Sequence, residues 1–146
     1  MDQKLGSKQL KAWEIFITRQ ASVLRKIEQD LENREGVLPL HWYDVLLVLS
    51  HAENGKLRFN EIADQIVTSR SALSRSIEKL ELQGYVKREK APEDARGQYA
   101  MITEKGRSAQ KASWVHYRAS IQKHFGRFLT TEDAINLELI LDKISI

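Results

Sequence analysis

The chain has 146 residues, 42% of them hydrophobic and 29% charged, and its formal net charge is +3. This length suits one domain, and the composition is that of an ordinary globular protein rather than a disordered one. The absence of cysteine excludes disulfides, thiolate nucleophiles and zinc sites built from cysteine.

No apolar stretch approaches the roughly 20 residues that span a bilayer, and residues 1–7 lack the apolar core of a signal peptide. We therefore expect a cytoplasmic protein with no membrane partner. The mildly basic charge is compatible with a polyanionic partner, but many proteins without a nucleic-acid role share it.

Residues 8–33 show a long helical period of apolar side chains. The members of this stripe recur at spacings of three and four: Leu10, Trp13, Ile17, Gln20, Leu24, Ile27 and Leu31. Gly36 and Pro39 interrupt the period, and Pro39 suits the first turn of a second predicted helix at about 40–52.

The middle of the chain contains the elements of a winged helix-turn-helix. In chain order we expect a strand at 56–58, a helix at 60–66, a tight connection at 67–68, a helix from about 69 to 83, a strand at 85–88, a polar loop at 91–97 and a strand at 99–102. Gly84 ends the longer helix. Two helices joined in this way place the second in the DNA major groove, and the loop between the strands, the wing, reaches the neighbouring backbone or minor groove.

Beyond the wing, Thr103 is a predicted cap for a long helix that runs to about Phe128. Thr130 and Asp133 form a predicted capping box for a last helix. The fold class is therefore mainly α (α+β): one domain over 1–146, with a winged helix DNA-binding module at 39–106 and flanking helices at 8–38 and 107–146.

The flanking helices carry apolar stripes that a module of this size cannot cover alone, so we expect them to form the dimerisation region of a homodimer. A two-fold dimer also presents two recognition helices to two DNA half-sites about one helical turn apart. The alternative is that these helices wrap around one enlarged monomeric core.

The predicted helix at 69–83 has two distinct faces. At about 100° per residue, Leu73, Ile77 and Leu80 point into the core, whereas the opposite side carries the candidate DNA-binding residues. These are Ser71 and Arg75 with Ser74 on the flank, joined at the start of the helix by Thr68, Ser69 and Arg70. Arginine donates two hydrogen bonds to guanine, and serine bonds base edges or phosphates. Glu78 would repel phosphates, so we expect it to read cytosine or to pair with Lys79 or Arg75.

The predicted wing is basic. Lys87, Arg88, Lys90 and Arg96 are its candidate DNA contacts, and Arg96 lies near the loop tip, where a narrow minor groove attracts it. Gly97 permits a positive φ in the turn, and Asp94 is expected to orient Arg75 or Arg96 through a charge-assisted pair.

An effector or coupling site is a further hypothesis. The predicted helices at 8–33 and 40–52 bring Trp13, His41, Trp42 and Asp44 to one region, where apolar walls meet a few polar groups. A packing role for Trp13 is the simpler interpretation, because it lies on the apolar stripe. Asp44 needs a partner within an apolar helix segment, and that partner is either a ligand or an arginine of the winged module.

No catalytic constellation, nucleotide-binding glycine loop or metal-ligand cluster accompanies these elements, so we expect no enzyme activity, no cofactor and no metal. The four histidines contain no pair at metal-ligand spacing.

Several segments are similar to one known family. Asp94-Ala95-Arg96-Gly97, followed by Ile102-Thr103-Glu104-Lys105-Gly106, resembles the D-x-R-G…[LI]-T-x-x-G signature of the multiple-antibiotic-resistance regulators, the MarR family. Residues 42–46 and 67–75 resemble that family too. The resemblance implies a homodimeric transcription regulator, usually a repressor that binds a palindromic operator and often releases DNA when a small aromatic or phenolic acid binds. It also implies groove-reading roles for Ser71 and Arg75 and a minor-groove role for Arg96.

The alternative function is a winged-helix interaction module that contacts a protein partner without binding DNA. An acidic or apolar recognition face would favour that function. The face here is polar and basic, which favours DNA.

Overall fold

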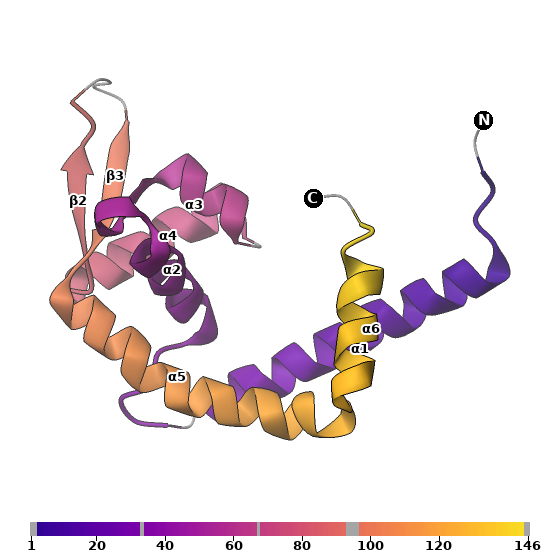
Figure 1. The fold of residues 1–146 in the computed structure, drawn as a ribbon. Coiled ribbons are helices and arrows are strands. Elements are labelled where there is room, and N and C mark those ends of the chain that lie inside the picture. The colour runs from indigo at the N-terminus through magenta and orange to yellow at the C-terminus, as the bar shows by residue number, and fades with distance from the viewer. Residues whose placement is uncertain (1–2, 33, 67, 93–96, 145–146) are drawn as a thin grey trace. The chain divides into compact units, whose positions relative to one another are not determined.

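A computed structural model of the chain describes residues 3–32, 34–66, 68–92 and 97–144 (Figure 1). The chain divides into two compact units. The winged-helix unit comprises Leu31–His116, and the helical unit comprises Met1–Asp30 together with Tyr117–Ile146. The first unit therefore extends beyond the predicted module at 39–106, because it includes the end of the first helix and half of the fifth.

The winged-helix unit contains the predicted elements in the predicted order. They are α2 (Leu40–His51), β1 (Lys56–Arg58), α3 (Phe59–Gln65), α4 (Arg70–Leu82), β2 (Val86–Lys90), β3 (Gln98–Ile102) and the first part of α5 (Glu104–His124). The strands form one antiparallel sheet in the order β1-β3-β2, with β2 and β3 drawn as the paired arrows of the wing (Figure 1). The mainly α architecture with a winged helix is thus confirmed.

The core of this unit lies where α2, α3 and α4 meet the sheet. Leu73, Ile77 and Leu80 of α4 are at most 2% exposed, as the helical period predicts. They are joined by buried residues of the neighbouring elements: Val45, Leu46 and Leu49 of α2, Ile62 of α3, Val86 of β2 and Ala100 of β3. Because one face of α4 is anchored in this core, the opposite face is held in a defined orientation.

The end of α4 explains why β2 begins later than the sequence pattern predicts. Gly84 has φ +77°, its N–H donates to the carbonyl of Glu81, and the N–H of Tyr85 donates to the carbonyl of Leu80. This is a Schellman motif, which requires the left-handed conformation that glycine adopts without a steric penalty. Tyr85 therefore belongs to the helix end, and the strand starts at Val86 instead of residue 85.

Thr103 joins the start of α5 to the end of α4. Its hydroxyl accepts a hydrogen bond from the Gly106 N–H at 3.0 Å, which caps α5 as predicted, and donates one to the Gly84 carbonyl at 2.6 Å. The Thr103 N–H also donates to the Tyr85 carbonyl at 3.0 Å. These bonds hold the first turn of α5 against the helix end.

The helical unit contains most of α1 (Ser7–Glu32), the second half of α5 and α6 (Thr131–Leu141). The predicted capping box of α6 is confirmed by reciprocal bonds between Thr130 and Asp133 at 3.0 and 2.9 Å. The predicted extension of α5 to Phe128 is wrong. The helix ends at His124 because Phe125 leaves the helical region at φ −137°, ψ −62°, and a short 3-10 turn at Gly126–Phe128 follows.

A polar cluster joins α1 to α5 inside the helical unit. The Asp30 carboxylate accepts hydrogen bonds from the Ser120 hydroxyl and from Nε2 of His124, each at 2.8 Å, and Lys123 Nζ lies 3.8 Å away. The hydrogen bond from Ser120 is the main cause that lowers the pKa of Asp30 below its ordinary value of 3.8. The charged carboxylate is thus the form that this packing favours.

We expect Asp30→Asn to remove a pH-dependent part of the stability. A carboxyl whose pKa is lowered by folding stabilises the protein above its unfolded pKa, and this contribution is lost as the pH falls through the folded pKa. The unfolding free energies of parent and variant should therefore differ most near neutral pH and converge below about pH 4. Urea unfolding at several pH values measures this. Glu28→Gln, which removes an exposed carboxylate of the same helix, is the control; curves that remain parallel would contradict the assignment.

The apolar stripe of α1 is mostly uncovered in the single chain. Ile27 and Leu31 are 3% and 2% exposed, but Trp13 is 56% exposed, and Leu10, Ile17 and Leu24 are exposed as well. Trp13 thus does not pack in the core of the single chain, and its predicted packing role on the apolar stripe stays a prediction. α6 also exposes large apolar side chains: Ile135, Leu139, Ile140 and Leu141. Among the described helices, none is long and apolar enough to cross a membrane.

Candidate nucleic-acid interface

The outward face of α4 is small, polar and basic. Ser69 is the N-cap, and its hydroxyl accepts a hydrogen bond from the Ala72 N–H at 3.1 Å. Ser71, Ser74 and Arg75 are exposed on the side opposite the buried leucines. Thr68 is also exposed, immediately before the cap. The structure therefore brings the α4 candidates onto one accessible surface.

Arg75 makes no hydrogen bond or ion pair with any described residue, so its five N–H donors are free for an external acceptor. The expected pairing of Glu78 with Arg75 or Lys79 is not found in the described part of the chain. Glu78 therefore remains an exposed carboxylate on the same face, and its oxygens can accept a hydrogen bond from the amino group of a cytosine.

Arg70, the first residue of α4, is held by a side chain that the sequence reasoning missed. Its Nη1 donates to Oδ1 of Asn60 at 2.8 Å, across the turn that separates α3 from α4. The two residues are ten positions apart, so no helical or strand spacing signals their contact.

The basic side chains of β2 have different surroundings. Lys87 and Lys90 are exposed. Arg88, however, lies opposite Ala100 in the β2–β3 register and is directed to the helix side of the sheet. Its Nε is 3.5 Å from Oε1 of Glu81, and its Cζ is 5.7 Å from the centre of the Phe59 ring. Arg88 thus already has partners within the chain, and its predicted contact with DNA stays a prediction.

Two predicted site residues belong to the tip of the wing. Asp94 and Arg96 lie outside the described residues, so their roles remain predictions. Gly97 is described and lines a cavity, but its positive φ also remains a prediction.

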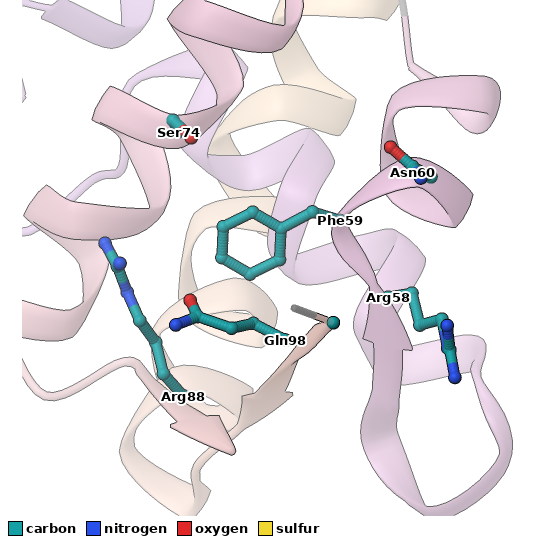
Figure 2. Close-up of a pocket in the computed structure, with 7 residues that line it drawn as sticks. Arg58, Phe59, Asn60, Ser74, Arg88 and Gln98 are labelled. Atoms are coloured by element: carbon teal, nitrogen blue, oxygen red, sulfur yellow. The ribbon is translucent and has the colours of Figure 1, made fainter. Parts of the chain in front are cut away.

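A cavity of about 470 Å³ lies between α3, α4 and the wing strands (Figure 2). Phe59 forms one wall, with Ser74 on α4 and with Arg88 and Gln98 from the strands around it (Figure 2). Arg58, Asn60 and Gly97 complete the lining. The Arg88 guanidinium, the Gln98 amide and the Ser74 hydroxyl beside an aromatic ring suit a phosphate or a carboxylate. The Arg58 guanidinium is directed away from them (Figure 2) and lies over the Tyr99 ring, 5.5 Å from its centre. The sequence reasoning did not single out Arg58, Phe59, Asn60 or Gln98.

Three of the four effector candidates lie on α2. Burial raises the pKa of Asp44, which has no hydrogen-bond or ion-pair partner among the described residues, so the expected arginine partner is absent there. Nε1 of Trp42 is buried without a described hydrogen-bond acceptor. The exposed His41 ring lies 6.2 Å from the Trp42 ring, edge to face. Trp13 belongs to the helical unit, and its predicted approach to α2 remains untested.

The part of the chain that the structure describes contains no group of three or more metal-ligating side chains. Its polar features are donors and cations at the surface of a winged helix, which suit the recognition of a polyanion by hydrogen bonds and charge.

The comparisons with known proteins agree with this geometry. Residues 36–97 match the model of the MarR family. AbsC, a MarR family transcriptional regulator from Streptomyces coelicolor, is 28% identical, with 96% of this chain and 93% of that chain covered and a TM-score of 0.80. Sco3205, a MarR family transcriptional regulator from the same organism solved in complex with DNA, is 25% identical, with 97% and 88% covered and a TM-score of 0.83.

A third similar structure is that of BpsR from Bordetella bronchiseptica, a protein whose DNA binding is regulated by 6-hydroxynicotinic acid. It is 16% identical, with 91% of this chain and 97% of that chain covered and a TM-score of 0.78, and this likeness concerns the fold. The comparison with curated proteins found no match.

Proposed function

We propose that this chain, whose residues 36–97 match the MarR family, is a transcriptional regulator of that family and a repressor that binds a palindromic operator as a homodimer. In this proposal α4 reads the major groove and the wing at 91–97 enters the minor groove. The observation that carries it is the exposed Ser71, Ser74 and Arg75 surface on a helix whose other face is fixed in the core.

The described contacts divide the interface into reading and positioning roles. Arg75 has free donors for guanine, and Ser71 and Ser74 have hydroxyls for base edges or phosphates. Thr68, Ser69 and Arg70 would contact the backbone at the helix start, and Lys87 and Lys90 would contact it from the wing. Arg88 would contact DNA from its position in the cavity between α3, α4 and the wing, where its side chain contacts Glu81 and Phe59. Arg96 would read the minor groove, with Asp94 and Gly97 orienting it.

The uncovered apolar side chains of α1 and α6 support dimerisation. A soluble chain that leaves Trp13 and its neighbours exposed has a surface suited to a second copy. We assign this role to the flanking segments 8–38 and 107–146. Two copies related by a two-fold axis would present two α4 helices to half-sites about one turn apart.

Release by a small aromatic or anionic effector is part of the proposal. Trp42 and Asp44 each carry a buried or half-buried polar group without a described partner, and His41 lies beside them. Such groups in an apolar setting give orientation and specificity to a ligand. The assignment of Trp13 to an effector site stays a prediction.

The first experiment is selection of bound duplexes from a random library, followed by titration of the selected duplex at 50 and 200 mM salt. We expect a palindrome with half-sites about one helical turn apart. If six phosphates are neutralised, affinity should fall by about a thousandfold over this range.

The same experiment separates DNA binding from the alternative function. A winged-helix module that contacts a protein through an apolar surface would select no duplex, and its binding would depend weakly on salt. Selection of no duplex, with and without aromatic acids added, would favour that alternative.

A further inference from the structure

We propose that Asn60 is a positioning residue that holds Arg70 ready for DNA, an inference that rests on the proposed function. The carrying observation is the hydrogen bond from Arg70 Nη1 to Asn60 Oδ1 at 2.8 Å. Both side chains are exposed, so the contact lies at the surface that the DNA would cover.

Both ends of this hydrogen bond are built on fixed backbone. Asn60 is in the first turn of α3, where the Glu61 carboxylate accepts the Arg58 N–H at 2.9 Å and caps the helix. Arg70 opens α4, where Ser69 caps the Ala72 N–H. The starts of the two helices are therefore well defined, and the hydrogen bond joins them directly across the helix-turn-helix.

The acceptor is neutral, and this is what makes the contact suitable for DNA recognition. Arginine has five N–H donors in a planar fork, so a bond from Nη1 fixes the plane of the group and leaves most donors for a phosphate. An amide oxygen orients the guanidinium without cancelling its charge. A carboxylate in the same place would orient the guanidinium equally but would repel the DNA phosphates.

Pre-orientation increases affinity because a long side chain that is already ordered loses less freedom on binding. We expect Asn60→Ala to weaken binding to the selected duplex by about two- to tenfold. The base preference should stay nearly the same, because Arg70 is assigned to the DNA backbone, and backbone contacts carry no sequence information directly. The salt dependence should stay the same, because no charge is removed.

The test is a double-mutant cycle on the full-length protein with the selected duplex. Asn60→Ala should weaken binding in the parent but cause no further loss in the Arg70→Ala background. Asn60→Asp should keep the base preference yet bind more weakly, with a smaller salt slope. Gln65→Ala is the matched control, because its amide on the same helix bonds, among the described residues, only the local Glu61 carbonyl at 3.3 Å.

Equal losses from Asn60→Ala in both backgrounds would overturn the proposal, since Asn60 would then act on DNA directly or through the fold. Unchanged binding of Asn60→Ala would overturn it as well. Unfolding free energies of every variant identify losses that come from the fold. If the parent itself selects no duplex, the proposed function fails; if Arg70→Ala weakens binding and Asn60→Ala does not, only the positioning role fails.

Discussion

Gly106→Ala is expected to lower the free energy of unfolding by about 3 kcal/mol, at the upper end of the usual cost of overpacking a core. Gly106 is buried in the first turn of α5. A Cβ there would overlap the carbonyl oxygen of Tyr85 and would lie 2.9 Å from Cγ1 of Ile102. Both neighbours belong to the winged-helix unit, so the substitution should affect the scaffold that holds α4.

The clash is severe because the Tyr85 backbone has little freedom to move. Its N–H bonds the Leu80 carbonyl in the Schellman motif, and its carbonyl accepts the Thr103 N–H at 3.0 Å. Relief of the overlap would therefore disturb the end of α4 and the cap of α5 together. The threonine-glycine spacing of the sequence signature thus has a steric cause in this chain.

Urea unfolding and thermal unfolding measure the effect. Gly126→Ala is the matched control: its new Cβ would meet the flexible end of the Gln122 side chain, which can rotate away. We expect that control to unfold close to the parent, whereas Gly106→Ala should melt roughly 6–12 °C earlier. A Gly106→Ala protein as stable as Gly126→Ala would mean that the Tyr85 carbonyl is not held as described.

Arg75→Ala is expected to reduce affinity for the selected duplex by about 1–3 kcal/mol per contacted base pair and to broaden the base preference there. Arg75 is exposed on α4, beside Ser71 and Ser74, and has no described partner within the chain. The loss would therefore report on an external contact rather than on a broken internal one. In a dimer it would occur once in each half-site.

Two further variants identify the kind of contact. Arg75→Lys keeps the charge but removes the planar pair of donors, so it should retain the salt slope and lose the guanine preference. Arg118→Ala removes an exposed arginine of the helical unit and controls for net charge. Unchanged affinity and base preference of Arg75→Ala would show that α4 does not read DNA through this face.

The boundaries that were predicted wrongly share a cause. α5 was expected to reach Phe128, and β2 was expected to begin at residue 85. In both places the apolar pattern continues past the point where the backbone changes direction. Phe125 leaves the helical region of φ and ψ just before Gly126. The N–H of Tyr85 donates to the Leu80 carbonyl and so belongs to the end of α4. Hydrophobic periodicity reports which side chains face the core and not where the hydrogen-bond pattern ends.

The sequence by itself determined the features that depend on neighbours three or four residues apart. The core face of α4, the Ser69 cap, the Thr130 capping box and the left-handed Gly84 all follow from such local rules. Together with the order of the elements, these rules were sufficient for the winged helix and for the polar, basic surface of α4.

Only the tertiary structure decided which side chains from distant segments meet. The Asn60–Arg70 bond, the contacts of Arg88 with Glu81 and Phe59, and the cavity between α3, α4 and the wing each combine separate elements. The fit of Gly106 against Tyr85 is of the same kind. Such contacts depend on how packed elements are placed to within about an ångström, and residue spacing along a flexible chain does not specify that distance.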